Sequence, residues 1–213
     1  MEDGKRANKE RRFWRRFAPR YDRFVEKQVK ISYQILIGKI LDEIEKGNSV
    51  LEVAAGTGLI ALEVAGKAGE VKAVDITPEM VRFAEKKAKE RSIKNTRFSV
   101  GDAYALPFDD GSFDAAVCSN ALHNMMEPKR ALTEMRRVLK KGGKLITPTY
   151  CHGEGLKSRM LSRLMSLSGF PGYHRFTIES LSGLISDSGF EIEKIEIIED
   201  RIPLAFIVGR PKK

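Results

Sequence analysis

The stretch N-S-V-L-E-V-A-A-G-T-G, residues 48–58, decides the fold. It begins as a short apolar run, 49–53, that is typical of a buried strand, and it ends in small residues that turn the chain sharply. Residues 59–65 then place apolar side chains at helical spacing. Strand, small-residue turn and helix begin a nucleotide-binding α/β unit, because residues without bulk let a ligand approach the backbone. Alone, the pattern G-x-G-x-x-A at Gly56, Gly58 and Ala61 also fits a turn that serves packing only.

A second short strand, residues 71–75, ends in the carboxylate of Asp75, 17 residues after Gly58. Nucleotide-binding folds place an acid at this position to accept hydrogen bonds from ribose hydroxyls. A strand-end cap is the alternative, and the preceding glycines favour the ribose site.

The composition indicates an ordinary globular chain. Its 213 residues fit one domain, 1–213, with 42% hydrophobic and 31% charged residues. The two cysteines, Cys118 and Cys151, lack metal-site spacing, so no metal is expected. With Cys118 on a predicted buried strand, a reduced, cytoplasmic chain is favoured. We see no apolar run of roughly 18 to 20 residues and no secretion signal.

The positive charge is concentrated at the N-terminus. Residues 1–30 hold 11 Lys or Arg against five Asp or Glu, out of a net charge of +9 for the chain. Such a basic arm can bind nucleic acid or an anionic membrane, or can simply be a solvated helix face. We expect peripheral membrane contact rather than nucleic-acid binding, and the sequence does not indicate an oligomeric state.

Three helical segments are expected before the first strand. Residues 1–10 are predicted to be frayed or helical only at their end, and 11–17 to be amphipathic. Pro19 is predicted to interrupt the chain and to start a helix over 19–27. A further helix over 32–45 is expected to bury Ile35, Leu36, Ile40, Leu41 and Ile44.

After Asp75 the pattern alternates between helices and strands. Helices are predicted over 77–91 and 128–139, strands over 97–100, 113–118 and 144–147, and a turn at 140–143. This alternation is typical of a mostly parallel, doubly wound sheet.

The alternation stops at an insert, 151–176, which contains an amphipathic helix over 156–167. A last helix then runs from Thr177 to near Gly189. Two strands, 191–199 and 202–208, are joined by so short a turn that only an antiparallel pair is possible. The predicted sheet has seven strands and ends in this hairpin.

Five stretches together resemble the class I S-adenosylmethionine-dependent methyltransferases, in the branch of the ubiquinone/menaquinone C-methyltransferases. They are V-L-E-V-A-A-G-T-G, A-V-D-I-T-P-E-M, G-D-A-Y-A-L-P-F-D-D-G-S-F-D, S-N-A-L-H-N and R-R-V-L-K-K-G-G-K. The resemblance covers about 21–146 and, more loosely, the terminal hairpin, and it implies a Rossmann-like α/β fold. We expect residues 1–46 to form an N-terminal helical lid and the insert, 151–176, to cover the substrate side. It departs from the family at Ala54, where a glycine is usual.

The resemblance implies S-adenosylmethionine as the cofactor and S-adenosylhomocysteine as a product. Asp75 would hold the ribose and Asp102 the adenine amino group, while Glu52 would either act near the cofactor ammonium or tie the turn. The assigned cofactor residues are Tyr21, Glu52, Ala54, Ala55, Gly56, Thr57, Gly58, Asp75, Ile76, Met80, Gly101, Asp102, Ala103, Ser119 and Asn120. Tyr21 and Met80 also fit plain core positions.

His123 is the candidate catalytic residue, because it follows the fourth strand at the edge where ligands bind. Its unperturbed pKa near 6.5 suits proton removal from an acceptor. Relatives that methylate quinones have arginine before the asparagine here, whereas this chain has His123-Asn124. A solvent-facing loop histidine is the alternative for His123 and the favoured interpretation for His152 and His174.

The sequence therefore predicts a methyltransferase for a small acceptor that is lipid-like or quinone-like. Two alternatives remain at this point: an NAD(P)-dependent oxidoreductase with the same first turn, and a non-catalytic basic protein that binds nucleic acid or membranes and retains the fold.

Overall fold

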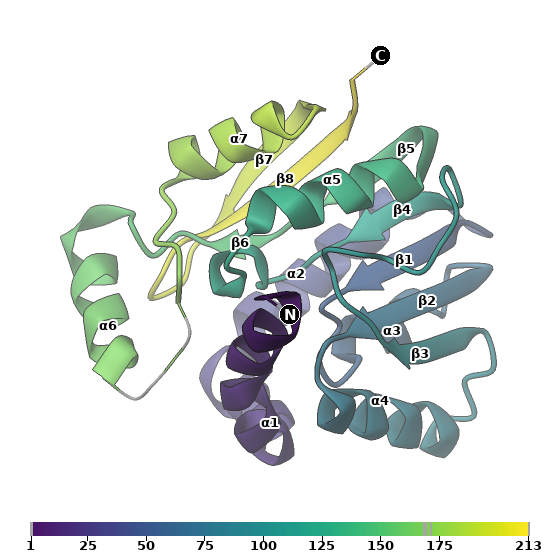
Figure 1. The fold of residues 1–213 in the computed structure, drawn as a ribbon, viewed down its shortest axis with the longest axis horizontal. Coiled ribbons are helices and arrows are strands. Elements are labelled where there is room, and N and C mark those ends of the chain that lie inside the picture. The colour runs from purple at the N-terminus through teal and green to yellow at the C-terminus, as the bar shows by residue number, and fades with distance from the viewer. Residues whose placement is uncertain (1, 168–169, 171, 213) are drawn as a thin grey trace.

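A computed structural model describes residues 2–167, 170 and 172–212 and shows a twisted sheet flanked by helices (Figure 1). The strands are β1 (Ser49–Val53), β2 (Glu70–Asp75), β3 (Thr96–Val100), β4 (Phe113–Val117), β5 (Leu139–Ile146), β6 (Thr149–Tyr150), β7 (Phe190–Ile198) and β8 (Leu204–Pro211). The helices are α1 (Glu2–Gln28), α2 (Lys30–Glu43), α3 (Leu59–Val64), α4 (Pro78–Glu90), α5 (Pro128–Val138), α6 (Gly155–Leu167) and α7 (Ile178–Asp187), with a 3-10 turn η1 (Leu122–Asn124).

The strand order is β3-β2-β1-β4-β5-β8-β6, and β7 pairs with β8. The first five strands in this order are parallel, and β8 is antiparallel to β5, β6 and β7. The predicted doubly wound, mostly parallel sheet with a terminal hairpin is confirmed. The predicted number of seven strands is wrong, because the two-residue strand β6 adds an eighth. The order reverses between β1 and β4, which is the place where such sheets bind ligands.

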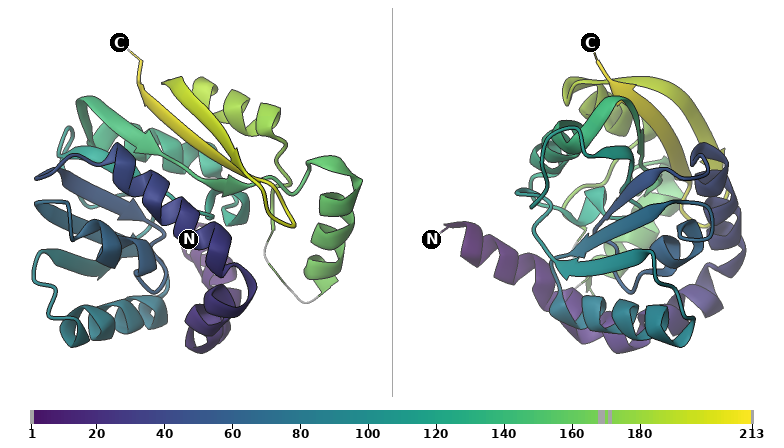
Figure 2. Two further views of the ribbon diagram at one scale, coloured as in Figure 1. Left: turned by 180° about the vertical axis from the view of Figure 1, so that it is seen from behind. Right: turned by 90° about the vertical axis from the view of Figure 1, so that its right-hand side faces the viewer.

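The two faces of the sheet are covered by different helices (Figure 2). Alternate residues of β1 point to opposite faces, so Leu51 joins the core under α5 and α7, whereas Val50 joins the core under α2 and α3. This burial on both sides explains why Val50, Leu51 and Val53 of the first strand are apolar although they point to different faces.

The interruption predicted at Pro19 is wrong, and so is fraying of residues 1–10 over the described residues. Helix α1 runs through Pro19 from Glu2 to Gln28. A proline inside a helix costs about 3 kcal/mol or more, because it removes one backbone hydrogen bond and crowds the preceding turn. Aromatic contacts span Pro19, because Trp14 and Phe17 before the proline both pack against Tyr21 after it.

Two smaller expectations also need correction. Ile35 is 46% exposed rather than buried, while Leu36 and Ile40 are fully buried. A turn was predicted at 140–143 and a strand from residue 144, whereas strand β5 already begins at Leu139. Residues 140–143 loop out of the ladder between the pairs Phe113–Leu139 and Ala115–Lys144, with Gly142 at a φ of +80°.

The predicted insert begins after β6 and includes α6, which stands apart from the sheet layers at one end of the molecule (Figure 1). Residues 168, 169 and 171 of this insert lie outside the described residues. Helix α7 starts at a capping box, in which Thr177 and Ser180 each accept from the other's backbone N–H. Within the described ranges, no helix combines the length and apolarity needed to cross a membrane.

Candidate functional site

The turn after β1 owes its shape to left-handed backbone at three positions. Ala54, Gly56 and Gly58 have φ of +57°, +54° and +75°. A Cβ on Gly58 would lie 2.7 Å from the ring of Phe98, so only glycine fits there. Ala54 takes the conformation that glycine adopts freely, at a cost of roughly 1–2 kcal/mol. The family's glycine at this position therefore has a backbone reason, and this chain retains the geometry with alanine.

Asp75 shapes this turn, and it also faces the cleft that is described below. Its carboxylate accepts from the backbone N–H of Gly56 and of Thr77, each at 2.8 Å. A carboxylate has about four acceptor positions, so two remain for a ligand. Burial raises the pKa of Asp75, against these two hydrogen bonds.

Glu52 ties the turn to the next helix. It is 4% exposed, and its carboxylate accepts from the backbone N–H of Ala61 at 2.8 Å. Burial raises its pKa to about 8. It does not line the cleft described next, so of its two predicted roles the geometry supports the structural one.

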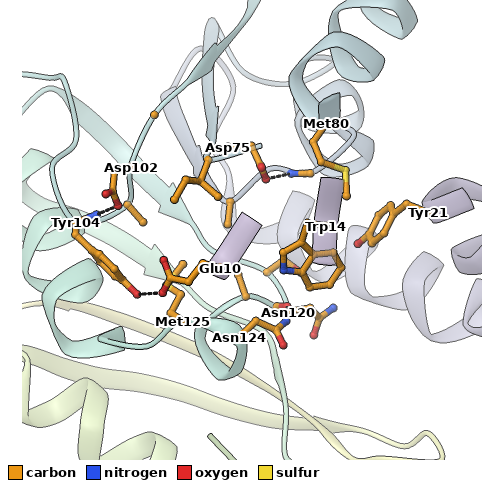
Figure 3. Close-up of a pocket in the computed structure, with 17 residues that line it drawn as sticks. Glu10, Trp14, Tyr21, Asp75, Met80, Asp102, Tyr104, Asn120, Asn124 and Met125 are labelled. Carbon is orange, nitrogen blue, oxygen red and sulfur yellow. Dashed lines mark hydrogen bonds between the residues drawn. The ribbon is translucent and has the colours of Figure 1, made fainter. Parts of the chain in front are cut away.

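A cleft of about 100 Å³ lies at the carboxyl ends of the parallel strands (Figure 3). It brings together most of the predicted cofactor residues: Tyr21, Ala54, Gly56, Asp75, Ile76, Met80, Gly101, Asp102, Ala103, Ser119 and Asn120. Buried oxygens of Ser119, Asn120 and Asn124 have no hydrogen-bond partner among the described residues. Unsatisfied polar atoms that line a cleft are suited to a polar ligand.

Three other predicted residues do not line the cleft: Ala55, Thr57 and Gly58. Thr57 instead donates its hydroxyl to the carboxylate of Asp22 on α1. Asp22 also pairs with Lys87 of α4 at 2.7 Å. The middle of α1 is therefore fastened to the turn and to the neighbouring helix.

The start of α1 supplies site residues that sequence analysis missed. Glu10 is 7% exposed and accepts from the hydroxyl of Tyr104 at 2.7 Å and from the backbone N–H of Met126 at 2.8 Å. Arg6 pairs with both Glu10 and Asp102. Trp14, Tyr104, Ala121, Asn124 and Met125 complete the lining with Glu10. A usable signal was present: positions 6, 10, 14, 17 and 21 share one helical face.

A second, apolar cavity of about 410 Å³ adjoins the first. Trp14, Tyr21, Asn120 and Asn124 line both. The rest of its wall comes from α1, the start of α2, η1, β6, α6 and the β7–β8 turn: Phe13, Phe17, Phe24, Val25, Val29, Tyr33, His123, Tyr150, His152, Leu161, Met165, Phe170, Asp200, Arg201 and Ile202.

The wall of this cavity carries a pair of histidines. His123 and His152 are 2% and 3% exposed, with ring centroids 4.9 Å apart. The solvent-facing position expected for His152 is therefore wrong, as is that alternative for His123. Neither Nδ1 has a hydrogen-bond partner within the described part of the chain.

The pKa values of these two rings differ from the expected value near 6.5. Burial lowers the pKa of His152 to about 4. Burial, with His152 and His174 nearby, puts the pKa of His123 well below 6.5. Both rings are therefore neutral at pH 7. His174 is half-buried rather than solvent-facing, and its backbone N–H donates to the carbonyl of His123 at 3.1 Å.

Over the described ranges, no group of three or more His, Cys, Asp or Glu side chains is arranged to hold a metal ion. Cys118 and Cys151 are buried free thiols, and burial raises the pKa of both.

Comparison with known proteins identifies the central part of the chain. Residues 51–147 match the sequence model of a methyltransferase domain family. The predicted resemblance to class I S-adenosylmethionine-dependent methyltransferases is confirmed over this segment, which runs from within β1 to just past the end of β5. The alternatives of an oxidoreductase or a binding protein are not favoured by these matches.

Curated relatives match a part of this chain of similar length. A ubiquinone/menaquinone biosynthesis C-methyltransferase (UbiE) of Geobacter sp. (strain M21) is 42% identical over 109 residues, which cover 47% of this chain and 46% of the relative. A demethylmenaquinone methyltransferase of Renibacterium salmoninarum is 42% identical over 106 residues, covering 50% and 43%. The chain thus spans about half the length of the curated relatives it matches.

The likeness among solved structures extends further along the chain. A chain in the complex between the Haloferax volcanii Trm112 methyltransferase activator and a methyltransferase superposes with a TM-score of 0.80, covering 94% of this chain and 98% of that one. Its sequence identity is 20%, so this match shows the fold alone.

Proposed function

We propose that this chain, whose central segment is a class I methyltransferase domain, transfers a methyl group from S-adenosylmethionine to a small apolar acceptor. One observation carries the proposal: a polar cleft at the glycine turn and a larger apolar cavity share Trp14, Tyr21, Asn120 and Asn124 as common walls. Two substrates held in these two spaces would meet at the shared residues.

The residues of the cleft fit the parts of this cofactor. Asp75 has acceptor positions free for ribose hydroxyls, and Asp102 lines the same cleft, where its carboxylate could accept from an adenine amino group. Ile76 and Met80 supply apolar surface for the ring. Left-handed backbone at Ala54 and Gly56 lets a ligand come close to the chain. When bound, the sulfonium group supplies a methyl that a nucleophile can displace.

The cleft is smaller than a cofactor of this size needs. Its volume is about 100 Å³, whereas ligand pockets are typically about 300–1,000 Å³. Glu10 and Trp14 of α1 occupy its wall, and Arg6 covers Asp102. We therefore propose that the first turns of α1, around Arg6 and Glu10, move outward when the cofactor enters, whereas Trp14 and Tyr21 stay on the wall of the cleft. Residues 1–46 would then act as a lid, as the sequence predicts.

The acceptor space favours an apolar, ring-containing molecule. Aromatic side chains from α1, together with Phe170, Leu161 and Met165 of the insert, form an apolar wall. Relatives named for ubiquinone, menaquinone and demethylmenaquinone make a quinone-like ring one candidate, and a lipid-like molecule is the other. Residues 151–176 would then form the acceptor side of a single domain, 1–213.

His123 is proposed to act on the acceptor rather than on the cofactor, since it lines only the apolar cavity. A neutral ring can take a proton from a hydroxyl or carbon acid, or can orient the acceptor by a hydrogen bond. Methyl transfer itself needs mainly an in-line arrangement of donor and acceptor.

The basic arm is proposed to add contact with an anionic membrane surface. Arg12, Arg16, Arg20 and Arg23 are exposed on α1, whose opposite face packs on the site. Cations of this kind attract anionic lipid headgroups at low ionic strength.

Calorimetric titration with S-adenosylmethionine tests the cofactor assignment. Asp75→Asn should lose at least about tenfold in affinity, because charge-assisted hydrogen bonds to the ribose contribute roughly 1.5–3 kcal/mol. Asp114→Asn is the matched control, since Asp114 also accepts a backbone N–H on this sheet but lines neither cavity. Binding of NADH in place of S-adenosylmethionine would reject the proposal, as would equal affinity in both folded variants.

A further inference from the structure

Helix α6 carries its apolar residues on the outside. Leu156, Met160, Leu164 and Leu167 are 76%, 70%, 65% and 85% exposed. They recur at i, i+4, i+8 and i+11, so they form one stripe along the helix. Exposed apolar residues that are contiguous, rather than scattered, mark an interaction surface.

The inner face of α6 contains buried serines as well as apolar side chains. Ser158 and Ser162 are buried, and Arg175 donates to the Ser162 hydroxyl at 3.1 Å. Leu161 and Met165 line the apolar cavity. An ordinary surface helix buries its apolar face and exposes the polar one. Packing within the described chain therefore does not account for the outer stripe.

The charge on α6 has one sign. Lys157, Arg159 and Arg163 are exposed, and residues 155–167 contain no acidic residue. At about 100° per residue, Lys157 lies on one side of the apolar stripe and the two arginines lie on the other. An apolar stripe flanked by cations is the pattern of helices that lie in the plane of a membrane surface.

We infer that this outer face of α6, formed by Leu156, Met160, Leu164, Leu167, Lys157, Arg159 and Arg163, docks on an anionic lipid bilayer. The apolar side chains enter the boundary of the acyl chains, and the three cations contact lipid headgroups. A second copy of this chain fits less well, because apposing two such faces would bring six cations together. An apolar peptide would leave those cations without partners.

Lipid docking at α6 places the acceptor cavity at the membrane. One side of α6 faces that cavity, and Phe24 of α1 both lines the cavity and is 42% exposed. α6 stands at the edge of the molecule, beyond the sheet layers (Figure 1). An acceptor dissolved in the bilayer would therefore have a short path into the cavity. This consequence, unlike the docking itself, rests on the proposed function.

Flotation of the full chain with vesicles tests the docking. The vesicles contain phosphatidylcholine with or without phosphatidylglycerol, and the expected binding requires the anionic lipid. The double variant Met160→Gln/Leu164→Gln should weaken binding by at least about tenfold, because two exposed apolar side chains no longer enter the bilayer. The matched control is Ile195→Gln/Ile197→Gln, which removes a similarly exposed apolar pair from β7 and should bind as the wild type does.

A charge variant and a depth measurement make the result specific. Lys157→Gln/Arg159→Gln/Arg163→Gln should lose roughly fivefold per cation, less at high salt. In a Trp14→Phe background, Leu164→Trp fluorescence should be quenched by brominated acyl chains. Phe83→Trp in the same background should not be quenched, since Phe83 lies on α4.

Several results would overturn the inference: equal binding of the α6 variants and the wild type, loss of binding only when the α1 arginines are neutralised, or no quenching at position 164. Light scattering that showed an oligomer dissociated by Met160→Gln/Leu164→Gln would assign the face to a second copy instead. Titration with S-adenosylmethionine without vesicles keeps the two proposals separate. Cofactor binding without vesicle binding rejects only the docking, and vesicle binding without cofactor binding rejects only the proposed function.

Discussion

Arg6 lies with its guanidinium on the carboxylate of Asp102, 96 residues further along the chain. The same guanidinium stacks over the ring of Tyr104, at 4.1 Å from the ring centroid. Asp102 is the acid assigned to the adenine amino group. Under the proposed function, helix α1 and the adenine ring would compete for this carboxylate, and cofactor binding would weaken the contact that holds α1 over the cleft.

The competition predicts that Arg6→Gln binds S-adenosylmethionine more tightly than the wild type. Releasing a partly buried ion pair of this kind corresponds to about 1 kcal/mol, or roughly a fivefold gain in affinity. Calorimetric titration measures it, with Arg12→Gln as the control, because Arg12 is exposed on the same helix. Weaker binding by Arg6→Gln would instead mean that Arg6 supports the bound state.

Added salt should also raise the affinity of the wild type for S-adenosylmethionine relative to that of Arg6→Gln. Screening weakens the contact between Arg6 and Asp102, so the affinity gap between the wild type and Arg6→Gln should narrow as the salt concentration rises. A gap that stays constant would contradict the competition.

Removal of α1 should have the opposite effect to Arg6→Gln. A chain without residues 1–30 loses Glu10, Trp14 and Tyr21 from the cleft wall, so its affinity for S-adenosylmethionine should fall. Trp14→Ala is the smaller variant, and it should weaken affinity without removing the helix. Circular dichroism checks that both chains are folded. Unchanged affinity in both would reject the lid role of residues 1–46.

Glu52 predicts a pH dependence of stability. Burial raises its pKa from 4.5 to about 8, so the folded chain holds this proton more tightly than the unfolded chain does. Its contribution is fully present below pH 4.5 and is lost as pH rises toward about 8. Glu52→Gln keeps an acceptor for the Ala61 N–H but cannot ionise. The wild type should therefore lose stability relative to Glu52→Gln over that window.

Denaturant titrations of the wild type and Glu52→Gln at a series of pH values measure this difference. The pKa of Asp75 is also raised by burial, so the wild-type curve alone would mix two groups. The difference between the two chains isolates Glu52. A constant difference across the window would show that Glu52 ionises freely in the folded chain.

The sequence predicted the parts of the site that local patterns encode. The first strand and its turn, residues 49–58, could be located because buried strands and glycine turns have strong sequence signatures. Asp75 could be located because it ends the next buried strand. For Arg6 and Glu10 the sequence shows only that they share a helical face with Trp14. Their place in the site depends on tertiary contacts with Asp102 and Tyr104 from a distant loop, which no local pattern encodes. The burial of His152 was missed for the same reason, since packing against His123 removes it from solvent.

The pairing of His123 with His152 leads to the prediction about catalysis. With a short-chain quinol as the acceptor, His123→Ala should lower turnover by something like the 10²–10⁴-fold typical of a lost general base, while cofactor affinity changes little. His123→Gln should be almost as poor, because an amide can donate a hydrogen bond but cannot take the proton. His152→Gln is the neighbouring control, and it should lower turnover less.

Because burial holds the pKa of His123 well below 6.5, the ring is already neutral at pH 6.5. The acidic limb of the rate profile should therefore lie below that pH, and turnover by the wild type should stay flat from there to neutrality. Near-full activity of His123→Gln would show that the residue only orients the acceptor, and an acidic limb centred at pH 6.5 would show that the ring titrates as it does in water.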